Sequence, residues 1–353
     1  MPLTTLKLEN VRAFERQSWE FGPRSVILGA NGVGKSTIIE AIRILSVGKS
    51  FRTSRFDELI RFEAPYCRII GERSETEGEA SSSASLRVPA AKVEFFYGQP
   101  FADAAKERIL TINSKPADWL GFIGQFPSVL FVPSDIDLVI GPPQLRRRYL
   151  DSILWQVDAE FRQNYLDFSR VLRERAALLF LLKIRRAGLD ELQPWNELIQ
   201  QLSAAIQTKR QQYIEYLQKQ LKGQLVGGQK VAVEYQPNQA ELAAVQNQEI
   251  QSSQNLYGAH RDELEILLGD RSARRFASRG QTRTIVVMLK TVESRFLAFK
   301  SGQAPLLLLD DMFSELDDEN SRYLFDSFEP DYQVILTSIK TQPLIKDWQT
   351  IKL

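Results

Sequence analysis

A nine-residue stretch near the N-terminus constrains this chain more than any other feature of its sequence. In residues 29–37, the first eight match the phosphate-binding pattern G-x-x-x-x-G-K-[ST], and Thr37 follows. A short apolar run, Ser25 to Leu28, precedes the match, and apolar residues follow in helical spacing from Ile38 to Leu45. This strand–loop–helix context favours a nucleotide-binding loop over a simple glycine-rich turn. The residues assigned to the nucleotide are Gly29, Ala30, Asn31, Gly32, Val33, Gly34, Lys35, Ser36 and Thr37.

Each part of this phosphate-binding loop has a chemical task. The glycines let backbone N–H groups converge on the α- and β-phosphates, and the N-terminus of the following helix points its positive dipole end at the same anions. Lys35 is predicted to reach the β- and γ-phosphates, and the Ser36 hydroxyl to take one position around Mg²⁺. The loop therefore predicts a nucleoside triphosphate with Mg²⁺.

Two adjacent carboxylates follow an apolar strand much later in the chain. Leu306 to Leu309 are four consecutive leucines, and Asp310 and Asp311 come directly after them. Taken alone, this pattern is typical of a buried strand that is followed by polar residues. Next to a phosphate-binding loop, Asp310 is predicted to hold the Mg²⁺ shell and Asp311 to orient or deprotonate the attacking water. Asp311 and Lys35 are thus the predicted catalytic residues.

A small-residue segment, Ser278 to Gln281, precedes a predicted helix from about Thr282 to Phe299. By itself the segment is a helix N-cap; as part of a site it would present Ser278, Gly280 and Gln281 to an anion. The order of phosphate loop, Ser-x-Gly-Gln and apolar strand with acids resembles that of ABC-type ATPases. The resemblance assigns residues 314–317 to a D-loop and makes Thr337, which follows the next apolar strand, a candidate γ-phosphate sensor.

Composition limits the remaining chemistry. The chain of 353 residues is long enough for about two domains. Its single cysteine excludes an internal disulfide, and one cysteine with one histidine excludes zinc clusters, so a metal would need oxygen ligands. The longest apolar run, Ala176 to Leu182, is far shorter than the ~20 residues of a membrane helix. With no targeting segment in sight, we expect a cytoplasmic protein without membrane contacts.

The middle of the chain has a helical pattern of its own. Apolar residues recur every three or four positions from Gln144 to Leu182 and from Pro194 to Leu221, which predicts two long helices in an antiparallel hairpin. The outer segments mix strands and helices. We therefore predict an α/β fold in which residues 1–134 and 284–353 form an ATPase lobe with mixed sheets and residues 135–283 form a helical lobe.

A net charge of +1 means that a nucleic acid would have to meet a local basic patch. Residues 144–222 hold 14 Lys+Arg against 9 Asp+Glu, a local surplus of five. Arg146, Arg147 and Arg148 are the candidate contacts to DNA phosphates, although a charge run is as often a solvated helix face. Consecutive helical residues point ~100° apart, so no surface can use all three.

Further stretches make the resemblance specific. The chain resembles the RecF family of bacterial recombination mediators, which is related to the ATPase heads of chromosome-maintenance proteins. The stretches that carry the resemblance, besides the ATPase motifs, are Leu8 to Arg12, Gly48 to Ser54, Phe131 to Asp135, Gly141 to Asp151 and Gly258 to Asp262.

The resemblance implies a set of functional expectations. It implies an ABC/SMC-head-like fold, binding of ATP with Mg²⁺, and slow, DNA-stimulated ATP hydrolysis. It implies a head-to-tail homodimer in which ATP lies between the Lys35 loop of one subunit and Ser278 of the other. It also implies action on gapped, junction or single-stranded DNA with RecO and RecR proteins, which helps to load RecA.

Several alternatives stay open at this point. A P-loop kinase or metabolic ATPase acting on a small substrate is the main rival, although it has no use for Ser278 to Gln281. A chromosome-maintenance head would need longer coiled-coil arms. His260-Arg261-Asp262 resembles a kinase triplet, but Leu267 stands where a kinase has asparagine, so an ion pair is the simpler interpretation. Either Gln125 or Ser134 could form the loop that links the lobes.

Overall fold

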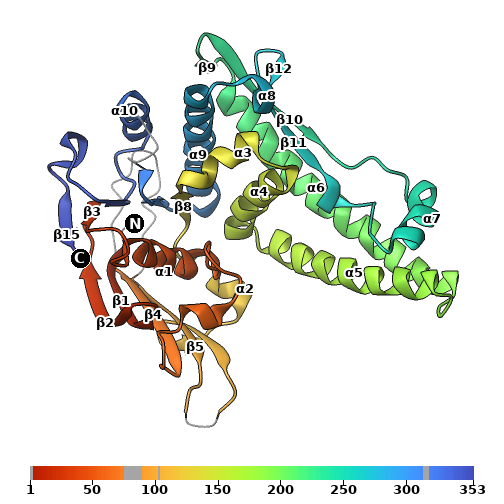
Figure 1. Cartoon of the computed structure of the whole chain (residues 1–353), viewed down its shortest axis with the longest axis horizontal. Helices are drawn as coiled ribbons and strands as arrows, with labels where there is room; N and C mark the ends of the chain where they lie inside the picture. The colour runs from red at the N-terminus through yellow and green to blue at the C-terminus, as the bar shows by residue number, and fades with distance from the viewer. Residues whose placement is uncertain (1–2, 75–89, 102–103, 313–317) are drawn as a thin grey trace. The chain divides into compact units, whose positions relative to one another are not determined.

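The computed structural model describes residues 3–74, 90–101, 104–312 and 318–353, with the side chains of 318–320 left aside (Figure 1). The chain divides into two compact units. Unit 1 comprises Met1–Asp135 and Val287–Leu353, and unit 2 comprises Ile136–Val286. Each unit has its own sheet and core, and each is described separately below.

A parallel sheet carries the functional edge of unit 1. Its strand order is β15-β3-β14-β13-β8, and every pairing in this order is parallel. The central strands are continuous apolar runs, as expected for strands covered on both faces. Their bounds are β3 (Arg24–Leu28), β8 (Ser128–Phe131), β13 (Leu306–Leu309), β14 (Val334–Ser338) and β15 (Gln349–Lys352).

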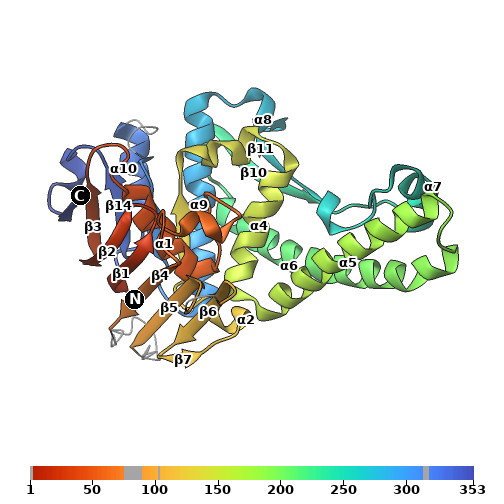
Figure 2. The same cartoon turned by 60° about the horizontal axis from the view of Figure 1, so that its bottom comes forward.

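An antiparallel sheet forms the second layer of unit 1, in the order β2-β1-β4-β5-β6-β7 (Figure 2). Its first strand alternates Leu6 and Leu8, both buried, with the exposed Lys7. Such alternation is typical of a strand with one face toward the core. The strands are β1 (Leu3–Val11), β2 (Phe14–Glu20), β4 (Tyr66–Arg73), β5 (Ala91–Gly98), β6 (Glu107–Ile112) and β7 (Lys115–Pro116).

Helix α1 (Lys35–Val47) contacts strands of both sheets, which explains why almost its whole length is buried. The later part of α9 (Arg279–Ser301) also belongs to unit 1. The smaller elements of unit 1 are η1 (Phe56–Leu59), α2 (Trp119–Phe122), η2 (Pro133–Ile136, which crosses into unit 2), α10 (Asp318–Asp326) and η6 (Pro343–Ile345).

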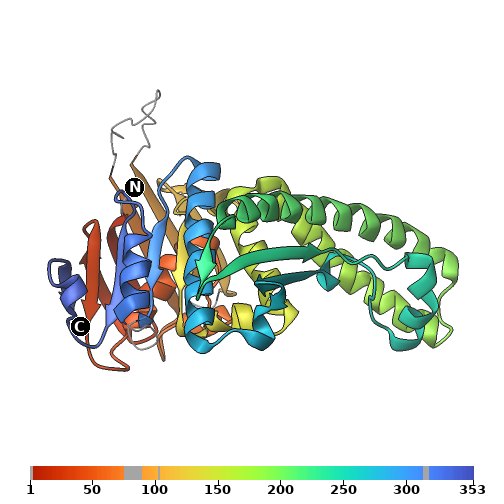
Figure 3. The ribbon, with the colours of Figure 1, turned by 90° about the horizontal axis from the view of Figure 1, so that it is seen from above.

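Unit 2 is built on a helical hairpin (Figure 3). Helices α5 (Ala159–Lys183) and α6 (Gln193–Leu221) pack side by side and are joined by a turn that includes η3 (Leu189–Leu192). An antiparallel sheet in the order β12-β11-β10-β9 accompanies them. The other elements are α3 (Asp137–Ile140), α4 (Pro143–Val157), β9 (Leu225–Val226), β10 (Gln229–Gln236), α7 (Leu242–Ser252), η4 (Ala259–Arg261), β11 (Glu263–Leu268), β12 (Arg271–Ser272) and α8 (Ala273–Phe276).

The predicted α/β architecture with mixed sheets and an antiparallel helical hairpin is confirmed, with one correction. The prediction of one continuous helix from Gln144 to Leu182 is wrong, because the helix is interrupted at Asp158 and divides into α4 and α5. Asp158 leaves the helical conformation, with φ −127° and ψ 105°, and its carboxylate accepts a hydrogen bond from the Phe161 N–H at 2.8 Å. An aspartate that caps the following helix in this way stabilises the break.

A buried ion-pair network holds unit 2 together. The Arg210 guanidinium donates to both oxygens of Asp151, at 2.9 Å each, and to Asp262 at 2.7 Å. Asp262 also accepts a 2.5 Å hydrogen bond from Tyr235, and burial raises the pKa of that phenol. Asp262 is therefore a structural carboxylate, which agrees with the ion-pair interpretation of His260-Arg261-Asp262.

Candidate nucleotide site

The phosphate-binding loop connects β3 to α1 and depends on two left-handed glycines. Gly32 has φ 83° and Gly34 has φ 109°, values that L side chains rarely adopt. A Cβ on Gly34 would also lie 2.5 Å from the ring of Phe14. Gly34 then ends the loop, and its carbonyl accepts the first helical hydrogen bonds from Thr37 and Ile38. The sequence Gly-Lys-Ser at the start of α1 is thus set by sterics as well as by chemistry.

Lys35 is buried at the centre of the loop. Its ammonium donates to the carbonyl oxygens of Gly29 and Ala30, at 2.7 and 2.8 Å. The amide of Gly29 in turn donates to the Ser338 carbonyl at 3.3 Å, which ties the loop to β14. The lysine charge is consequently held within the loop that the sequence assigns to phosphate.

Three predicted site residues from distant parts of the chain meet at one carboxylate. The hydroxyls of Ser36 and Thr337 both donate to Asp310 Oδ1, at 2.9 and 2.8 Å. They meet because β3, β13 and β14 are adjacent parallel strands, whose carboxyl ends share one edge of the sheet. This oxygen-rich cluster lies at the first turn of α1.

Asp311 takes an unusual backbone conformation at the same edge. Its φ of 52° lies in the left-handed region, which costs free energy for a residue other than glycine. Its N–H donates to the Thr337 hydroxyl at 2.9 Å, so Thr337 bridges the two aspartates. Strained backbone of this kind is concentrated at functional sites. The structure thus brings Lys35, Ser36, Asp310, Asp311 and Thr337 to the same end of the parallel sheet.

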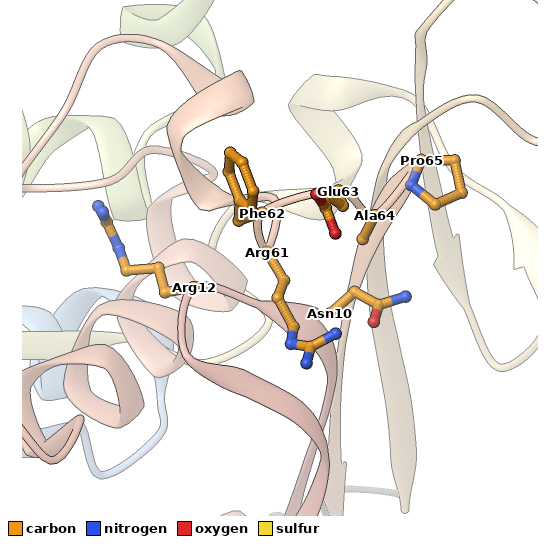
Figure 4. Close-up of a pocket in the computed structure, with 7 residues that line it drawn as sticks. All are labelled: Asn10, Arg12, Arg61, Phe62, Glu63, Ala64 and Pro65. Carbon is orange, nitrogen blue, oxygen red and sulfur yellow. The ribbon is translucent and has the colours of Figure 1, made fainter.

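A pocket of about 490 Å³ lies at the C-terminal end of β1 and was not predicted from the sequence (Figure 4). It is lined by Asn10, Arg12 and residues 61–65. Asn10, Arg12 and Glu63 all have positive φ. Phe62 is 86% exposed at its rim, an uncommon position for a large aromatic side chain.

A buried carboxylate connects this pocket to the phosphate-binding helix. Glu40 of α1 accepts two 2.7 Å hydrogen bonds from Arg12, and these raise the pKa of the guanidinium. Glu40 also accepts hydrogen bonds from Ser50 and from Arg52, the latter at 3.3 Å. The stretches Leu8 to Arg12 and Gly48 to Ser54, which contain these partners of Glu40, carried part of the family resemblance. They were the feature of the sequence from which this cluster could have been predicted.

Comparisons with known proteins agree over nearly the whole chain. The family model described as the RecF/RecN/SMC N terminal domain matches residues 2–352. The DNA replication and repair protein RecF of Moorella thermoacetica is 30% identical over 96% of this chain and 90% of its own length. The chain belongs to the RecF family. RecF of Staphylococcus epidermidis ATCC 12228 is 29% identical over 97% of this chain and 94% of its own length.

Two solved structures of the family superpose on this fold. The recombination mediator protein RecF-ATPrS in the RecFOR pathway has a TM-score of 0.87 and 26% identity, and the alignment covers 100% of this chain and 96% of that one. The corresponding RecF-ATP structure has a TM-score of 0.84 and 28% identity, covering 97% and 92%. The family resemblance and the ABC/SMC-head-like fold are both confirmed.

The predicted signature residues belong to unit 2 and begin α9. The Ser278 N–H donates to the Gln281 side chain at 2.8 Å, and the Gln281 N–H donates to the Ser278 hydroxyl at 3.2 Å. This reciprocal pair is a capping box, and both residues and Gly280 are solvent-exposed or partly so. Their role toward a nucleotide stays a prediction. The D-loop assigned to residues 314–317 lies outside the described residues.

The three predicted DNA-binding arginines of α4 have different environments. Arg146 is buried and forms an ion pair with Glu263 at 2.9 Å. Arg147 is partly buried and donates to the Asp262 carbonyl at 2.6 Å, and burial lowers its pKa. Arg148 is exposed. Two of the three therefore stabilise unit 2, and contact of the exposed Arg148 with DNA stays a prediction.

None of the helices that the structure describes has a stretch long and apolar enough to cross a membrane.

Proposed function

We propose that this chain is an ATP-dependent DNA-binding protein of recombinational repair and replication restart. The observation that carries the proposal is the meeting of Ser36, Asp310 and Thr337 at the mouth of a phosphate-binding loop. Family members with the same fold are described in complex with ATP and as DNA replication and repair proteins. ATP is accordingly the proposed ligand.

The site residues divide the work on ATP between them. The amides of residues 29–37 would surround the phosphates, and Lys35 would leave its two loop carbonyls to meet the β- and γ-oxygens. Thr337, buried beneath both aspartates, would transmit the presence of the γ-phosphate to Asp310 and Asp311. Asp311 would orient the attacking water.

The donor set fits Mg²⁺. A serine hydroxyl and a carboxylate oxygen 2.9 Å apart are hard oxygen ligands of the kind that Mg²⁺ prefers. In the described residues no group of three or more His, Cys, Asp or Glu could hold a metal alone, so phosphate oxygens and water would complete the shell. Bound Mg²⁺ would neutralise charge that develops on the phosphates.

The pocket at Asn10, Arg12 and residues 61–65 is the proposed site of the nucleoside. Phe62 offers a face on which a base can stack, and Arg61 offers hydrogen-bond donors. Glu40 anchors the pocket to α1 through Arg12, so occupation of the pocket and of the phosphate loop would be coupled.

The dimeric part of the proposal assigns Ser278, Gly280 and Gln281 to the ATP of a second subunit. A lone subunit would then bind ATP but hydrolyse it poorly, because its catalytic constellation is completed in trans. In each subunit, the lobe of residues 1–134 with 284–353 would supply the Lys35 loop, and the lobe of residues 135–283 would supply Ser278. Slow, DNA-dependent ATP hydrolysis would set the time at which the dimer is released. RecO and RecR proteins would be its partners in loading RecA at gapped DNA.

Binding of a fluorescent ATP analogue tests the nucleotide assignment directly. Lys35→Ala should weaken binding by about ten- to a hundredfold, the value of one charge-assisted hydrogen bond. Lys115→Ala removes an exposed lysine of β7 and serves as the matched control with unchanged affinity. Equal affinity in the wild type and the Lys35→Ala variant would contradict the assignment.

The rival function, a P-loop ATPase or kinase for a small substrate, predicts different behaviour. Such an enzyme would turn over without DNA and would stay monomeric with ATP. Hydrolysis measured with and without gapped duplex DNA separates the two, since the proposed function requires stimulation by DNA.

A further inference from the structure

Helix α5 has two faces with apolar residues. Its buried residues, which include Phe168, Val171, Leu178 and Leu182, recur at three- and four-residue spacing and lie on the side that packs against α6. A second set with the same spacing lies on the opposite, exposed side. This outer face consists of Leu166, Arg170, Arg173, Ala177, Phe180 and Ile184.

The outer face combines apolar and charged residues: four of its six members are apolar and two are arginines. Leu166, Phe180 and Ile184 are 38%, 52% and 41% exposed, and the neighbouring Leu181 is 39% exposed. Steps of four, three, four and three residues keep the first five members on one stripe of α5, and Ile184 follows directly after the last helical residue, Lys183. Single exposed hydrophobic residues such as Leu166 need no explanation, but Phe180, Leu181 and Ile184 lie together at the end of the hairpin, and clustered exposed apolar residues mark an interaction surface.

Positive charge exceeds negative charge along this side of the hairpin, where five exposed cations stand against the acids Asp167 and Glu174. Arg170 and Arg173 lie within the stripe, and Lys183, Arg185 and Arg186 follow at the hairpin turn, all of them exposed. None of these five cations forms an ion pair with another residue in the part of the chain that the structure describes. The surface therefore complements a partner that is acidic as well as apolar.

Buried polar contacts on the opposite side of α5 fix the position of this helix. Arg175, fully buried, forms a 2.6 Å ion pair with Glu249 of α7 and donates to Asn196 and Asn255. Glu249 also accepts from the Leu256 N–H at 2.7 Å. Figure 3 shows α7 beside the end of the hairpin. Buried polar groups satisfied this fully fix one conformation, which lowers the entropic cost of binding a partner.

We propose that the outer face of α5 docks an acidic amphipathic helix of a partner protein. Apolar side chains of such a helix would cover Phe180 and Ile184, and its carboxylates would meet Arg170 and Arg173. A nucleic acid fits less well, because phosphates would leave the aliphatic members of the stripe exposed to water. This surface shares no residue with the candidate nucleotide site, and the inference does not depend on the function proposed above.

A synthetic peptide tests the proposal with the full-length protein. The probe is a labelled amphipathic helix of about 20 residues, long enough to span about 30 Å, with leucines on one face and glutamates beside them. Its twin carries lysines in place of the glutamates. We expect the acidic peptide to bind, the twin to bind at least about tenfold more weakly, and added salt to weaken the acidic complex.

Two double variants locate the binding surface. Arg170→Glu with Arg173→Glu, and Phe180→Ser with Ile184→Ser, should each lower affinity for the acidic peptide by about tenfold. These positions are exposed, so circular dichroism and melting temperature should show a folded protein. The matched control is Lys219→Glu with Lys222→Glu, two exposed cations at the other end of α6, which should leave the affinity unchanged.

Several results would overturn the proposal. These are failure of the acidic peptide to bind, equal binding of its twin, and unchanged affinity in the two double variants. Single-stranded or duplex DNA that competes for this face, and loses affinity on Arg170→Glu with Arg173→Glu, would assign the face to nucleic acid instead. Light scattering that shows self-association lost in the serine variant would assign it to a second copy of this chain.

Discussion

Replacing the Thr337 hydroxyl by a methyl group should destabilise the carboxyl end of the parallel sheet. Thr337 is fully buried; its hydroxyl donates to Asp310 and accepts from the Asp311 N–H. A hydrogen bond to a charged group contributes about 1.5–3 kcal/mol and a neutral one about 1 kcal/mol. Thr337→Val conserves volume, so we expect a loss of about 2–4 kcal/mol, most of it from the polar groups left without a partner.

The assay must report on unit 1 alone, because a chain of two units need not unfold in one step. Amide hydrogen exchange of β13 and β14 in the wild type and the variant gives the local free energy of opening. Thr291→Val is the matched control, since this buried threonine makes a 2.9 Å hydrogen bond to the Val287 carbonyl within its own helix. The control should cost about 1 kcal/mol or less.

Function should change along with stability. If Thr337 senses the γ-phosphate, Thr337→Val binds ATP but hydrolyses it more slowly. A change in opening free energy below about 0.5 kcal/mol would refute the structural argument. Unchanged hydrolysis in the presence of DNA would refute the sensor role even if the stability falls.

Three further predictions rest on other parts of the structure. Gly34→Ala should abolish nucleotide binding, because the new Cβ would lie 2.5 Å from the Phe14 ring. The control Gly228→Ala should retain nucleotide binding, because no atom lies within 4 Å of its new Cβ. Equal nucleotide binding by the two variants would contradict this prediction. Burial raises the pKa of Cys67 to about 12, so its thiol should resist a disulfide reagent at about pH 8 until the protein unfolds, and rapid native labelling would be the wrong result. Burial also raises the pKa of Glu293 above the ordinary 4.5, so the folded state holds this proton more tightly and stability falls as pH rises. Glu293→Gln should therefore flatten the decline in unfolding free energy as the pH rises above about 4.5, and an unchanged slope would refute the assignment.

The sequence predicted those parts of the site that depend on local patterns. The phosphate-binding loop needs left-handed glycines and a helix start, and both leave a signature within nine residues. Asp310 was assigned to the candidate site because the four leucines before it indicate a buried strand, and the structure places it at the end of β13. Ser36 and Asp310 meet Thr337 because β3, β14 and β13 are neighbours in the parallel sheet. An alternation of strands and helices in the sequence is compatible with such a sheet, but it does not give the order of the strands within it.

The parts that could not be predicted depend on contacts between distant residues. Arg146 looks like a DNA contact in the sequence, but Glu263, more than a hundred residues later, pairs with it and buries it. The break at Asp158 was missed because apolar spacing continues through it, although aspartate is a common N-cap. The sequence did not single out Glu40 itself, because its partners Arg12 and Arg52 lie in other elements, although the stretches that hold them carried part of the family resemblance.

Light scattering with and without ATP and Mg²⁺ tests the central claim of an ATP-gated clamp most directly. The wild type should form a dimer that requires ATP and binds gapped duplex DNA more tightly than the monomer does, and Lys35→Ala should stay monomeric under the same conditions. A wild-type protein that stays monomeric with ATP and DNA would contradict the clamp and favour an ATPase that acts on a small substrate.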